Sequence, residues 1–299
     1  MAATTQVPPR TTPAHRAHRD PARSARRARN RPNFLAGIGG WLWLAVTVVP
    51  VYYVVVTSLK DQGTYFSSNP LLPPASPTLS NYGLVLENDF ARYFANSLAV
   101  TAGSVLSTLL VSFMAAYTIV RGRSRFLTLT HRLFLLGLAI PLHATIIPIY
   151  WMITKAHLYD TLAALILPSI AFAIPISVLI LSTFLRDVPR ELFESMRLDG
   201  CGEWTMMWRL ALPLVRPAVV TVGIYDALTV WNGFLFPLIL TQSPEIRVLP
   251  LSLWTFQGEF TINVPAVLAS VVLATLPLLV VYVIARRQLV RGLTAGFGK

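Results

Sequence analysis

The chain has 299 residues, of which 54% are hydrophobic and only 13% are charged. Soluble domains carry about 25% charged residues, so this composition indicates a membrane protein and argues against a soluble domain. The net charge is +12, but the basic residues are dispersed between apolar runs, which does not favour nucleic-acid binding, and the single Cys201 excludes a disulfide framework or a cysteine zinc site.

An arginine-rich segment precedes the first apolar run. The stretch ARSARRARNRPN, which ends at Asn33, is compatible with a nucleic-acid arm, a twin-arginine signal or a solvated tail. The apolar run that follows is too long for the core of a signal peptide and shows no clear cleavage site. We therefore expect residues 1–33 to form a disordered cytoplasmic tail that contacts anionic lipid headgroups.

Six apolar stretches follow, and each is long enough to cross a membrane as a helix. A transmembrane helix needs about 20 mostly apolar residues, and it satisfies its own backbone hydrogen bonds, as lipid requires. A β-barrel would need short alternating segments, which do not dominate here. Only the fifth stretch contains an Asp, Glu, Lys or Arg residue, which is Asp226. The expected spans are Asn33–Leu59, Tyr93–Val120, Leu133–Thr154, Thr161–Leu185, Pro217–Pro244 and Phe260–Ala285.

The distribution of basic residues predicts the orientation. Of the 25 Lys and Arg residues, 21 lie in the N-terminal tail, in the loops after spans two and four, and after span six. The positive-inside rule therefore places both termini in the cytoplasm. The outer segment between Lys60 and Arg92 is rich in Pro, Ser and Asn, and we expect it to be irregular and to end in a short interfacial helix. The expected fold is all-α, a polytopic membrane protein with six transmembrane helices in one domain, residues 34–299.

A dense polar segment, residues 186–216, separates spans four and five, and we call it the polar loop. Pro189 suits the first turn of a helix, because its missing N–H group is not needed there. In this helix the apolar Leu192, Phe193 and Met196 recur at helical spacing, while charged neighbours can face water. An interfacial amphipathic loop is the simplest interpretation of these residues alone.

Glycine and proline predict how the polar loop continues. Gly200 and Gly202 should end the first helix, because glycine adopts the left-handed conformation at little cost. A second short helix, Glu203–Leu210, should follow, and Pro213 and Pro217 should mark the turn back into the membrane.

The spacing of the polar loop is that of a known motif. Glu194-Ser195-Met196 is followed after three residues by Gly200, and after nine more by Leu210-Ala211-Leu212-Pro213. This resembles the cytoplasmic motif of bacterial ATP-binding-cassette importer permeases, which reads Glu-Ala-Ala, three residues, Gly, nine residues, an aliphatic residue, any residue, Leu-Pro. Ser195 and Met196 replace both alanines. Asp199 looks like the carbohydrate-importer version, and the stretches TVWNGFLFPLILT and RRQLVRGLTAGFGK resemble the smaller permease of maltose-type sugar importers.

The resemblance covers residues 34–299 and implies a type I importer permease. In that family the motif forms coupling helices that sit in a cleft of a cytoplasmic ATPase subunit. It implies that Glu194 offers its carboxylate to that subunit, that Gly200 permits a sharp reversal, and that Phe193, Met196 and Trp204 pack in the cleft. The residues expected to couple the chain to the ATPase are Glu194, Ser195, Met196, Asp199, Gly200, Leu210, Leu212 and Pro213.

The chain has no ATP site of its own by sequence. It lacks the pattern G-x-x-x-x-G-K-[ST], so we expect no cofactor in this chain, with ATP and Mg²⁺ on a partner ATPase. The tail Arg291–Lys299 resembles an extension that reaches toward the ATPase interface, and a frayed solvated end is the alternative.

Asp226 is the candidate for the substrate pathway. An Asp in mid-span costs about 2.5–3.5 kcal/mol on insertion scales, so it should face protein or water. Thr229 and Gly233 lie on its helix face and Asn232 lies nearby, which favours a sugar path. The alternative is a hydrogen bond to Ser or Thr of a neighbouring helix or to a partner permease. Aromatic rings stack on sugars, so three tryptophans are further candidates, although most membrane tryptophans are interface anchors: Trp151, Trp231 and Trp254.

A later outer segment, QSPEIRVLPLSLWTFQGEFTINVP, resembles the family's segment that reaches into the extracytoplasmic sugar-binding protein. Trp254, Phe256 and Gln257 are the residues there that we expect to contact that protein. The five histidines show no metal-binding spacing, and no nucleophile–base arrangement supports a hydrolase.

The sequence thus predicts one permease subunit of an ATP-driven carbohydrate importer in a bacterial plasma membrane. Its expected partners are a second, related permease, two ATPase subunits, a sugar-binding protein, the sugar and the lipid bilayer, but no nucleic acid. Disaccharides or oligosaccharides are favoured, with glycerol phosphate or another polyol as the alternative. A stand-alone secondary transporter would need an ion site, for which Asp226 is the only intramembrane acid, and a membrane enzyme would need a catalytic constellation.

Overall fold

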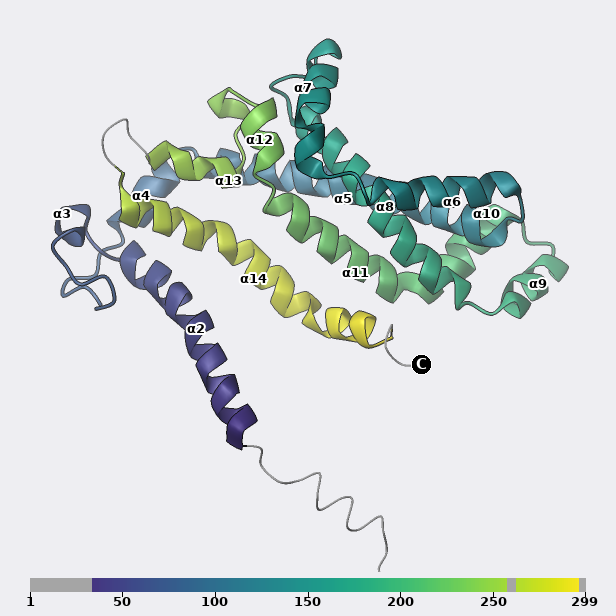
Figure 1. Cartoon of the computed structure of the whole chain (residues 1–299), viewed down its shortest axis with the longest axis horizontal. Coiled ribbons are helices and arrows are strands. Elements are labelled where there is room, and N and C mark those ends of the chain that lie inside the picture. The colour runs from purple at the N-terminus through teal and green to yellow at the C-terminus, as the bar shows by residue number, and fades with distance from the viewer. Residues whose placement is uncertain (1–33, 257–261, 296–299) are drawn as a thin grey trace, which may run out of the picture. The chain divides into compact units, whose positions relative to one another are not determined.

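The computed structural model describes residues 34–256 and 262–295, and every regular element within them is a helix (Figure 1). The chain divides into two compact units, residues 1–51 and 52–299, and helix α2 (Phe34–Ser58) contains the boundary. The expected disordered tail, residues 1–33, lies outside the described residues.

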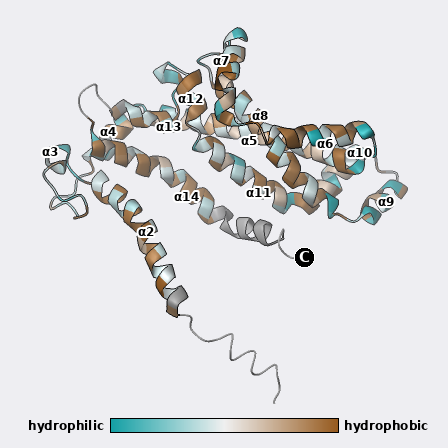
Figure 2. Cartoon of the chain, in the orientation of Figure 1, coloured by the Kyte–Doolittle hydropathy of each residue, from teal (hydrophilic) through white to brown (hydrophobic). Residues whose placement is uncertain are grey.

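Apolar helices dominate the described part of the chain, as the brown ribbons of Figure 2 show. Five helices are long and apolar enough to cross a membrane, and the count is six when two helices separated by a sharp bend are taken as one span. The predicted all-α class of polytopic membrane protein is therefore confirmed. The five continuous helices are α2, α5 (Phe90–Arg121), α8 (Leu162–Arg186), the run Glu203–Trp231, and α14 (Val264–Ala295).

The third predicted span is not one straight helix. It consists of α6 (Arg125–Gly137) and then η1 (Leu142–Thr145) with α7 (Ile146–Lys155), and the two parts are bent by 97°. The break ends at Pro141, which has no N–H group to continue a helix and which disfavours helical geometry in the residue before it.

The fifth predicted span, Pro217–Pro244, has the wrong bounds. Its helix begins earlier, at Glu203, and ends at Trp231, and the separate α12 (Leu235–Leu240) follows. At the break the Gly233 N–H group donates to the Val230 carbonyl at 3.0 Å, which makes a tighter turn than that of an α-helix. The side-chain amide of Asn232 donates a hydrogen bond to the Leu228 carbonyl.

The second unit is held together by close packing of α5, α8 and α11 (Leu212–Trp231), which lie side by side in Figure 1. A Cβ atom at Gly103 of α5 would lie 3.1 Å from Ile166 Cδ1 of α8, so glycine permits this approach. Hydroxyl-bearing residues line one buried face of α5 at helical spacing, and their small size suits close helix contact: Thr101, Ser104, Thr108 and Ser112.

The segment after α2 is largely irregular and contains the short helices α3 (Gln62–Tyr65) and α4 (Ser80–Glu87). Helix α4 is the short helix predicted near the end of the segment, and its interfacial position stays a prediction. Lys60 is only 2% exposed, and its ammonium group donates to the Asn69 carbonyl at 2.6 Å. Asn81 of α4 donates to the Lys60 carbonyl at 2.8 Å. These hydrogen bonds hold this largely irregular segment in place.

Candidate functional site: the polar loop and two cavities

The polar loop begins with helix α9 (Arg190–Leu198), whose end is built on Gly200. Pro189 stands one position before the first helical residue rather than within the first turn. Gly200 has φ +82°, the Cys201 N–H group donates to the Met196 carbonyl, and the Gly200 N–H group donates to the Arg197 carbonyl, both at 3.0 Å. This pair of bonds is the Schellman motif, so the predicted helix end at Gly200 is confirmed.

One face of α9 is buried against the chain's own helix α5. Phe193 is 2% exposed, its ring lies 6.3 Å from that of Tyr117, and the Arg121 guanidinium carbon lies 4.0 Å above it. The expectation that Phe193 is free to pack in a partner's cleft is therefore wrong. Met196 is half-buried against the same cluster.

The opposite face of α9 carries most of the motif side chains. Glu194, Ser195 and Asp199 are exposed, as expected. Two large apolar side chains of the polar loop are also exposed: Leu198 of α9 is 90% exposed, and Trp204 of α10 (Glu203–Met206) is 63% exposed. Apolar side chains at such exposure form a surface suited to a protein partner.

The second half of the polar loop differs from the prediction. Helix α10 (Glu203–Met206) continues through the π-helical segment η2 (Met207–Ala211) directly into α11, so no turn occurs at Pro213 or Pro217. The Leu212 N–H group donates to the Met207 carbonyl, five residues back. We attribute the continuity to this wider turn, because it lies directly before Pro213, whose missing N–H group would otherwise interrupt the bonding pattern. Leu210 and Leu212 are half-buried and Pro213 is exposed.

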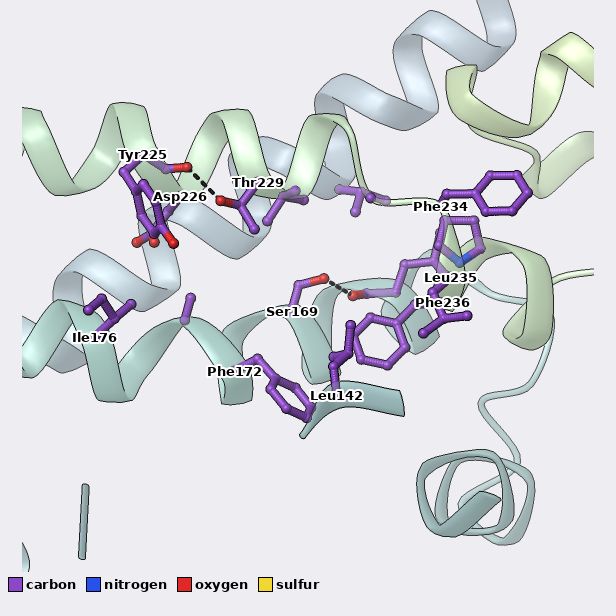
Figure 3. Close-up of a pocket in the computed structure, with 16 residues that line it drawn as sticks. Leu142, Ser169, Phe172, Ile176, Tyr225, Asp226, Thr229, Phe234, Leu235 and Phe236 are labelled. Atoms are coloured by element: carbon purple, nitrogen blue, oxygen red, sulfur yellow. Dashed lines mark hydrogen bonds between the residues drawn. The ribbon is translucent and has the colours of Figure 1, made fainter. Parts of the chain in front are cut away.

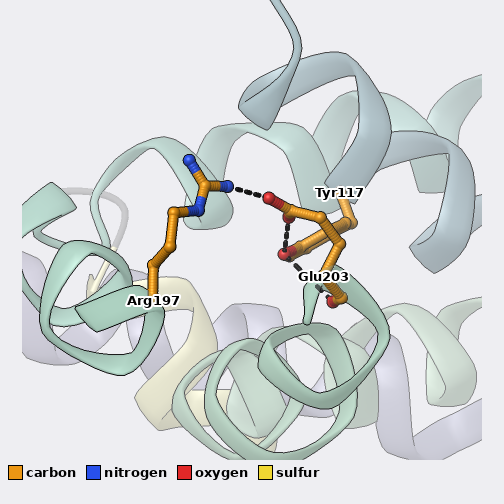
Figure 4. A network of polar contacts seen from close by, with 3 residues as sticks. All are labelled: Tyr117, Arg197 and Glu203. Carbon is orange, nitrogen blue, oxygen red and sulfur yellow. Dashed lines mark hydrogen bonds and ion pairs between the residues drawn. The ribbon is translucent and has the colours of Figure 1, made fainter. Parts of the chain in front are cut away.

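A polar network connects both parts of the polar loop to α5 (Figure 4). The Tyr117 hydroxyl donates to Glu203 Oε2 at 2.8 Å, and Glu203 Oε1 pairs with Arg197 Nη2. Tyr117 is buried, whereas Arg197 and Glu203 are exposed. No sequence motif marked Tyr117 or Glu203.

A cavity of about 200 Å³ lies between α8, α11 and the segment after α11 (Figure 3). Asp226, Thr229 and Gly233 all line it, as their spacing predicted, together with Ser169 and rings such as Phe172.

Asp226 is 2% exposed, and its Oδ2 atom accepts a hydrogen bond from Ser177 of α8 at 3.0 Å. The hydrogen bond to a neighbouring serine and the position beside a cavity are thus both present. Oδ1 has no hydrogen-bond partner among the residues that the structure describes. The carboxylate can therefore still accept a hydrogen bond from a ligand.

Trp231 and Asn232 do not line this cavity. They line a second one, of about 300 Å³, together with Trp254. Trp231 is buried and donates from Nε1 to the Ala274 carbonyl at 3.2 Å, which is a structural contact with α14. Trp254 is exposed with its ring 5.7 Å from that of Phe234, Phe256 is half-buried, and Gln257 lies outside the described residues. Trp151 is exposed on α7.

Asp160 joins two segments that are far apart in sequence. Its carboxylate accepts hydrogen bonds from the Gln242 N–H group at 2.8 Å, the Ser243 N–H group at 3.0 Å and the Ser243 hydroxyl. Burial alone raises the pKa of Asp160, but these hydrogen bonds outweigh it and hold the pKa below its usual value. In the described part of the chain, no group of three His, Cys, Asp or Glu residues could hold a metal ion.

Comparison with known proteins identifies the family. Residues 92–295 match the family described as binding-protein-dependent transport system inner membrane component. The chain is 39% identical over 255 residues to a putative ABC transporter permease protein, ORF2, of Caldicellulosiruptor sp., covering 85% of this chain and 93% of the relative. It is 32% identical over 270 residues to the diacetylchitobiose uptake system permease protein DasC of Streptomyces coelicolor, covering 86% of this chain and 96% of the relative.

Solved structures share the fold. A crystal structure of a bacterial ABC transporter involved in the import of the acidic polysaccharide alginate contains a chain that matches with a TM-score of 0.74 at 18% identity, over 86% of this chain and 98% of that one. A structure of the alginate transporter in complex with an alginate pentasaccharide-bound periplasmic protein matches with a TM-score of 0.58 at 15% identity, over 87% and 99% of the two chains. By the match over residues 92–295, and as its polar loop predicted, the chain belongs to the family of binding-protein-dependent transport system inner membrane components.

Proposed function

We propose that this chain is the permease subunit of an ATP-driven, binding-protein-dependent carbohydrate importer of a bacterial plasma membrane. Family membership and the identity to a diacetylchitobiose permease support this proposal. The chain pairs with a second, related permease, and two ATPase subunits bind ATP and Mg²⁺ and supply the energy. Both termini and the polar loop face the cytoplasm, consistent with the positive-inside rule.

The exposed face of α9 is the observation on which the proposal chiefly rests. Glu194 and Leu198 of α9 are exposed, as is Trp204 of the following α10, and the Schellman turn at Gly200 fixes where α9 ends. A protruding helix with one carboxylate and exposed apolar side chains suits a cleft on a protein partner. We propose that this face docks in the ATPase subunit. The motif residues Glu194, Ser195, Met196, Asp199, Gly200, Leu210, Leu212 and Pro213 then act as the coupling element.

The cavity beside Asp226 is the proposed sugar contact of this chain. The carboxylate and the Thr229 hydroxyl can bond sugar hydroxyl groups, and the ring of Phe172 can stack on a sugar face. Its volume of about 200 Å³ is below the roughly 300–1,000 Å³ of complete ligand pockets, so one sugar ring enters it and the remainder lies against the second permease. Trp231 and Asn232, which line the second cavity, are proposed to contact the sugar there.

The cavity lining argues against the glycerol phosphate alternative. No Lys or Arg is among the described residues that line it, and a phosphate would lie beside the Asp226 carboxylate. Phosphate groups are bound by cationic side chains. On the outer side, Trp254, Phe256 and Gln257 are the proposed contacts of the sugar-binding protein.

Uptake in proteoliposomes tests the function. The complex of both permeases and the ATPases is reconstituted with ATP inside and the binding protein outside, and radiolabelled diacetylchitobiose and melibiose are supplied as probes. We expect uptake only when both ATP and the binding protein are present. Uptake by this chain alone, driven by an ion gradient, would instead identify a secondary transporter.

A further inference from the structure

The polar loop has two kinds of connection to the membrane helices. The chain itself continues from the loop into α8 at one end and α11 at the other. The loop also contacts α5 without a covalent link. Phe193 packs on Tyr117 and Arg121, and the ring of Trp208 lies 5.7 Å from that of Phe113. The polar contact with α5 is the Tyr117–Glu203–Arg197 network (Figure 4).

Within this network the tyrosine bond is the contact that fixes the geometry. The Arg197 and Glu203 side chains are 61% and 53% exposed, and ion pairs at such exposure contribute little. The Tyr117 hydroxyl is buried on α5 and donates to a carboxylate at 2.8 Å, which makes the bond charge-assisted. The same carboxylate also pairs with Arg197 of α9, but the Tyr117 bond is the contact that orients α10 on α5.

Among the helices that extend from the polar loop to the cavity, α5 has the fewest features at which a helix bends. It runs over 32 residues without an internal proline, whereas α8 contains Pro168 and Pro175, and α11 follows a π-helical segment and contains Pro217. Prolines and π-helical turns are where helices bend. Val100 of α5 lines the cavity beside Asp226, about 25 Å along the helix from Tyr117 at 1.5 Å per residue.

We propose that Tyr117 is a positioning residue that transmits movement of the polar loop to α5, and through α5 to the cavity. This inference rests on the proposed function, since the ATPase supplies the movement. Without the Tyr117 bond the loop still moves α11, to which it is joined covalently, whereas α5 follows the loop less closely because only apolar packing then connects the two.

Spin labels on α5 and α11 test this difference. Cys201→Ser removes the only cysteine of the chain, and a single nitroxide is then attached at Leu98→Cys on α5 or at Leu228→Cys on α11. Leu98 and Leu228 are both exposed. The complete transporter, with cysteine-free partners, is measured in lipid with and without Mg-ATP and vanadate. The readout is the change in label mobility.

Tyr117→Phe is the decisive variant. It keeps the ring that packs on Phe193, and water can replace the lost hydroxyl at the exposed Glu203, so folding and assembly should persist. Copurification of the ATPase subunit with the Tyr117→Phe permease tests whether the complex still assembles. Glu203→Gln is a second variant that removes the charge, and Tyr282→Phe is the matched control, because Tyr282 is exposed and has no hydrogen bond within the described residues.

We expect Tyr117→Phe to reduce the nucleotide-dependent change at Leu98→Cys and to leave the change at Leu228→Cys intact. The loss of one hydrogen bond to a charged acceptor should shift the equilibrium between coupled and uncoupled α5 by about tenfold. Glu203→Gln should give an intermediate loss and Tyr282→Phe none. An unchanged response at Leu98→Cys, or an equal loss at both labels in an assembled complex, overturns the proposal while leaving the proposed function standing. If neither label responds to nucleotide in the chain with Tyr117 intact, both the role of Tyr117 and the proposed function are rejected.

Discussion

Gly200 offers the sharpest test of the polar loop, because a second glycine two residues away serves as its control. Gly200 has φ +82°, which L-residues rarely adopt, and a Cβ atom built there meets no other atom within 4 Å. Gly202 has φ −78°, and a Cβ atom there also meets nothing within 4 Å. The two sites therefore differ in backbone conformation and not in available space.

The expected cost of Gly200→Ala follows from that conformation alone. A left-handed backbone costs an L-residue about 1–2 kcal/mol, which lowers the population of the Schellman turn by about 5- to 30-fold. Asparagine tolerates this conformation better than alanine, so Gly200→Asn should have a smaller effect. Gly202→Ala should change the population by less than about twofold, since alanine accepts negative φ without strain.

Copurification of the ATPase subunit with detergent-solubilised permease measures this effect as a dissociation constant. The predicted order of affinity is Gly202→Ala equal to the unmodified chain, then Gly200→Asn, then Gly200→Ala. Equal affinities for Gly200→Ala and Gly202→Ala would show that the left-handed turn does not set the docking surface. Weaker binding by Gly200→Asn than by Gly200→Ala would contradict the conformational argument in the same way.

Three further predictions concern other parts of the chain. Asp226→Leu should abolish uptake without reducing the amount of assembled complex. Ser177→Ala, which removes the donor to Asp226 but keeps the carboxylate, should retain uptake, and normal uptake by Asp226→Leu would remove this carboxylate from the pathway. The lowered pKa of Asp160 means that its stabilising hydrogen bonds are fully present above its ordinary pKa of about 3.9 and are lost as pH falls through the lowered value. Thermal unfolding should therefore lose stability at acid pH more steeply in the unmodified chain than in Asp160→Asn, and identical pH profiles would contradict this assignment. Cys201, the only cysteine, should react with a membrane-impermeant maleimide in inside-out vesicles and not in intact cells, and labelling of intact cells would reverse the proposed orientation.

Features encoded in a short stretch of sequence could be predicted. Apolar runs between charges located the membrane helices, because the requirement for about 20 apolar residues acts on each run separately. The end of α9 at Gly200 was predictable because a left-handed turn needs glycine locally. The common face of Asp226, Thr229 and Gly233 followed from helical spacing alone.

Features that depend on packing between distant segments could not be predicted. The apolar run continues past Trp231, so composition does not mark where α11 ends. Helical spacing placed Phe193 on an apolar face, but only the fold shows that α5 covers it. Tyr117 lies in an apolar run and bonds Glu203, 86 residues away, and Asp160 bonds Ser243, 83 residues away.

The polar loop is proposed to connect an ATPase on another polypeptide to this chain's membrane helices. The most direct test is the double variant Glu194→Ala with Gly200→Ala, measured in proteoliposomes for sugar uptake and for retention of the ATPase subunit. We predict that ATP-driven uptake is lost and that the ATPase dissociates, while the permease remains folded in the membrane. Unchanged uptake with the ATPase fully retained would show that the polar loop does not connect the ATPase to the membrane helices.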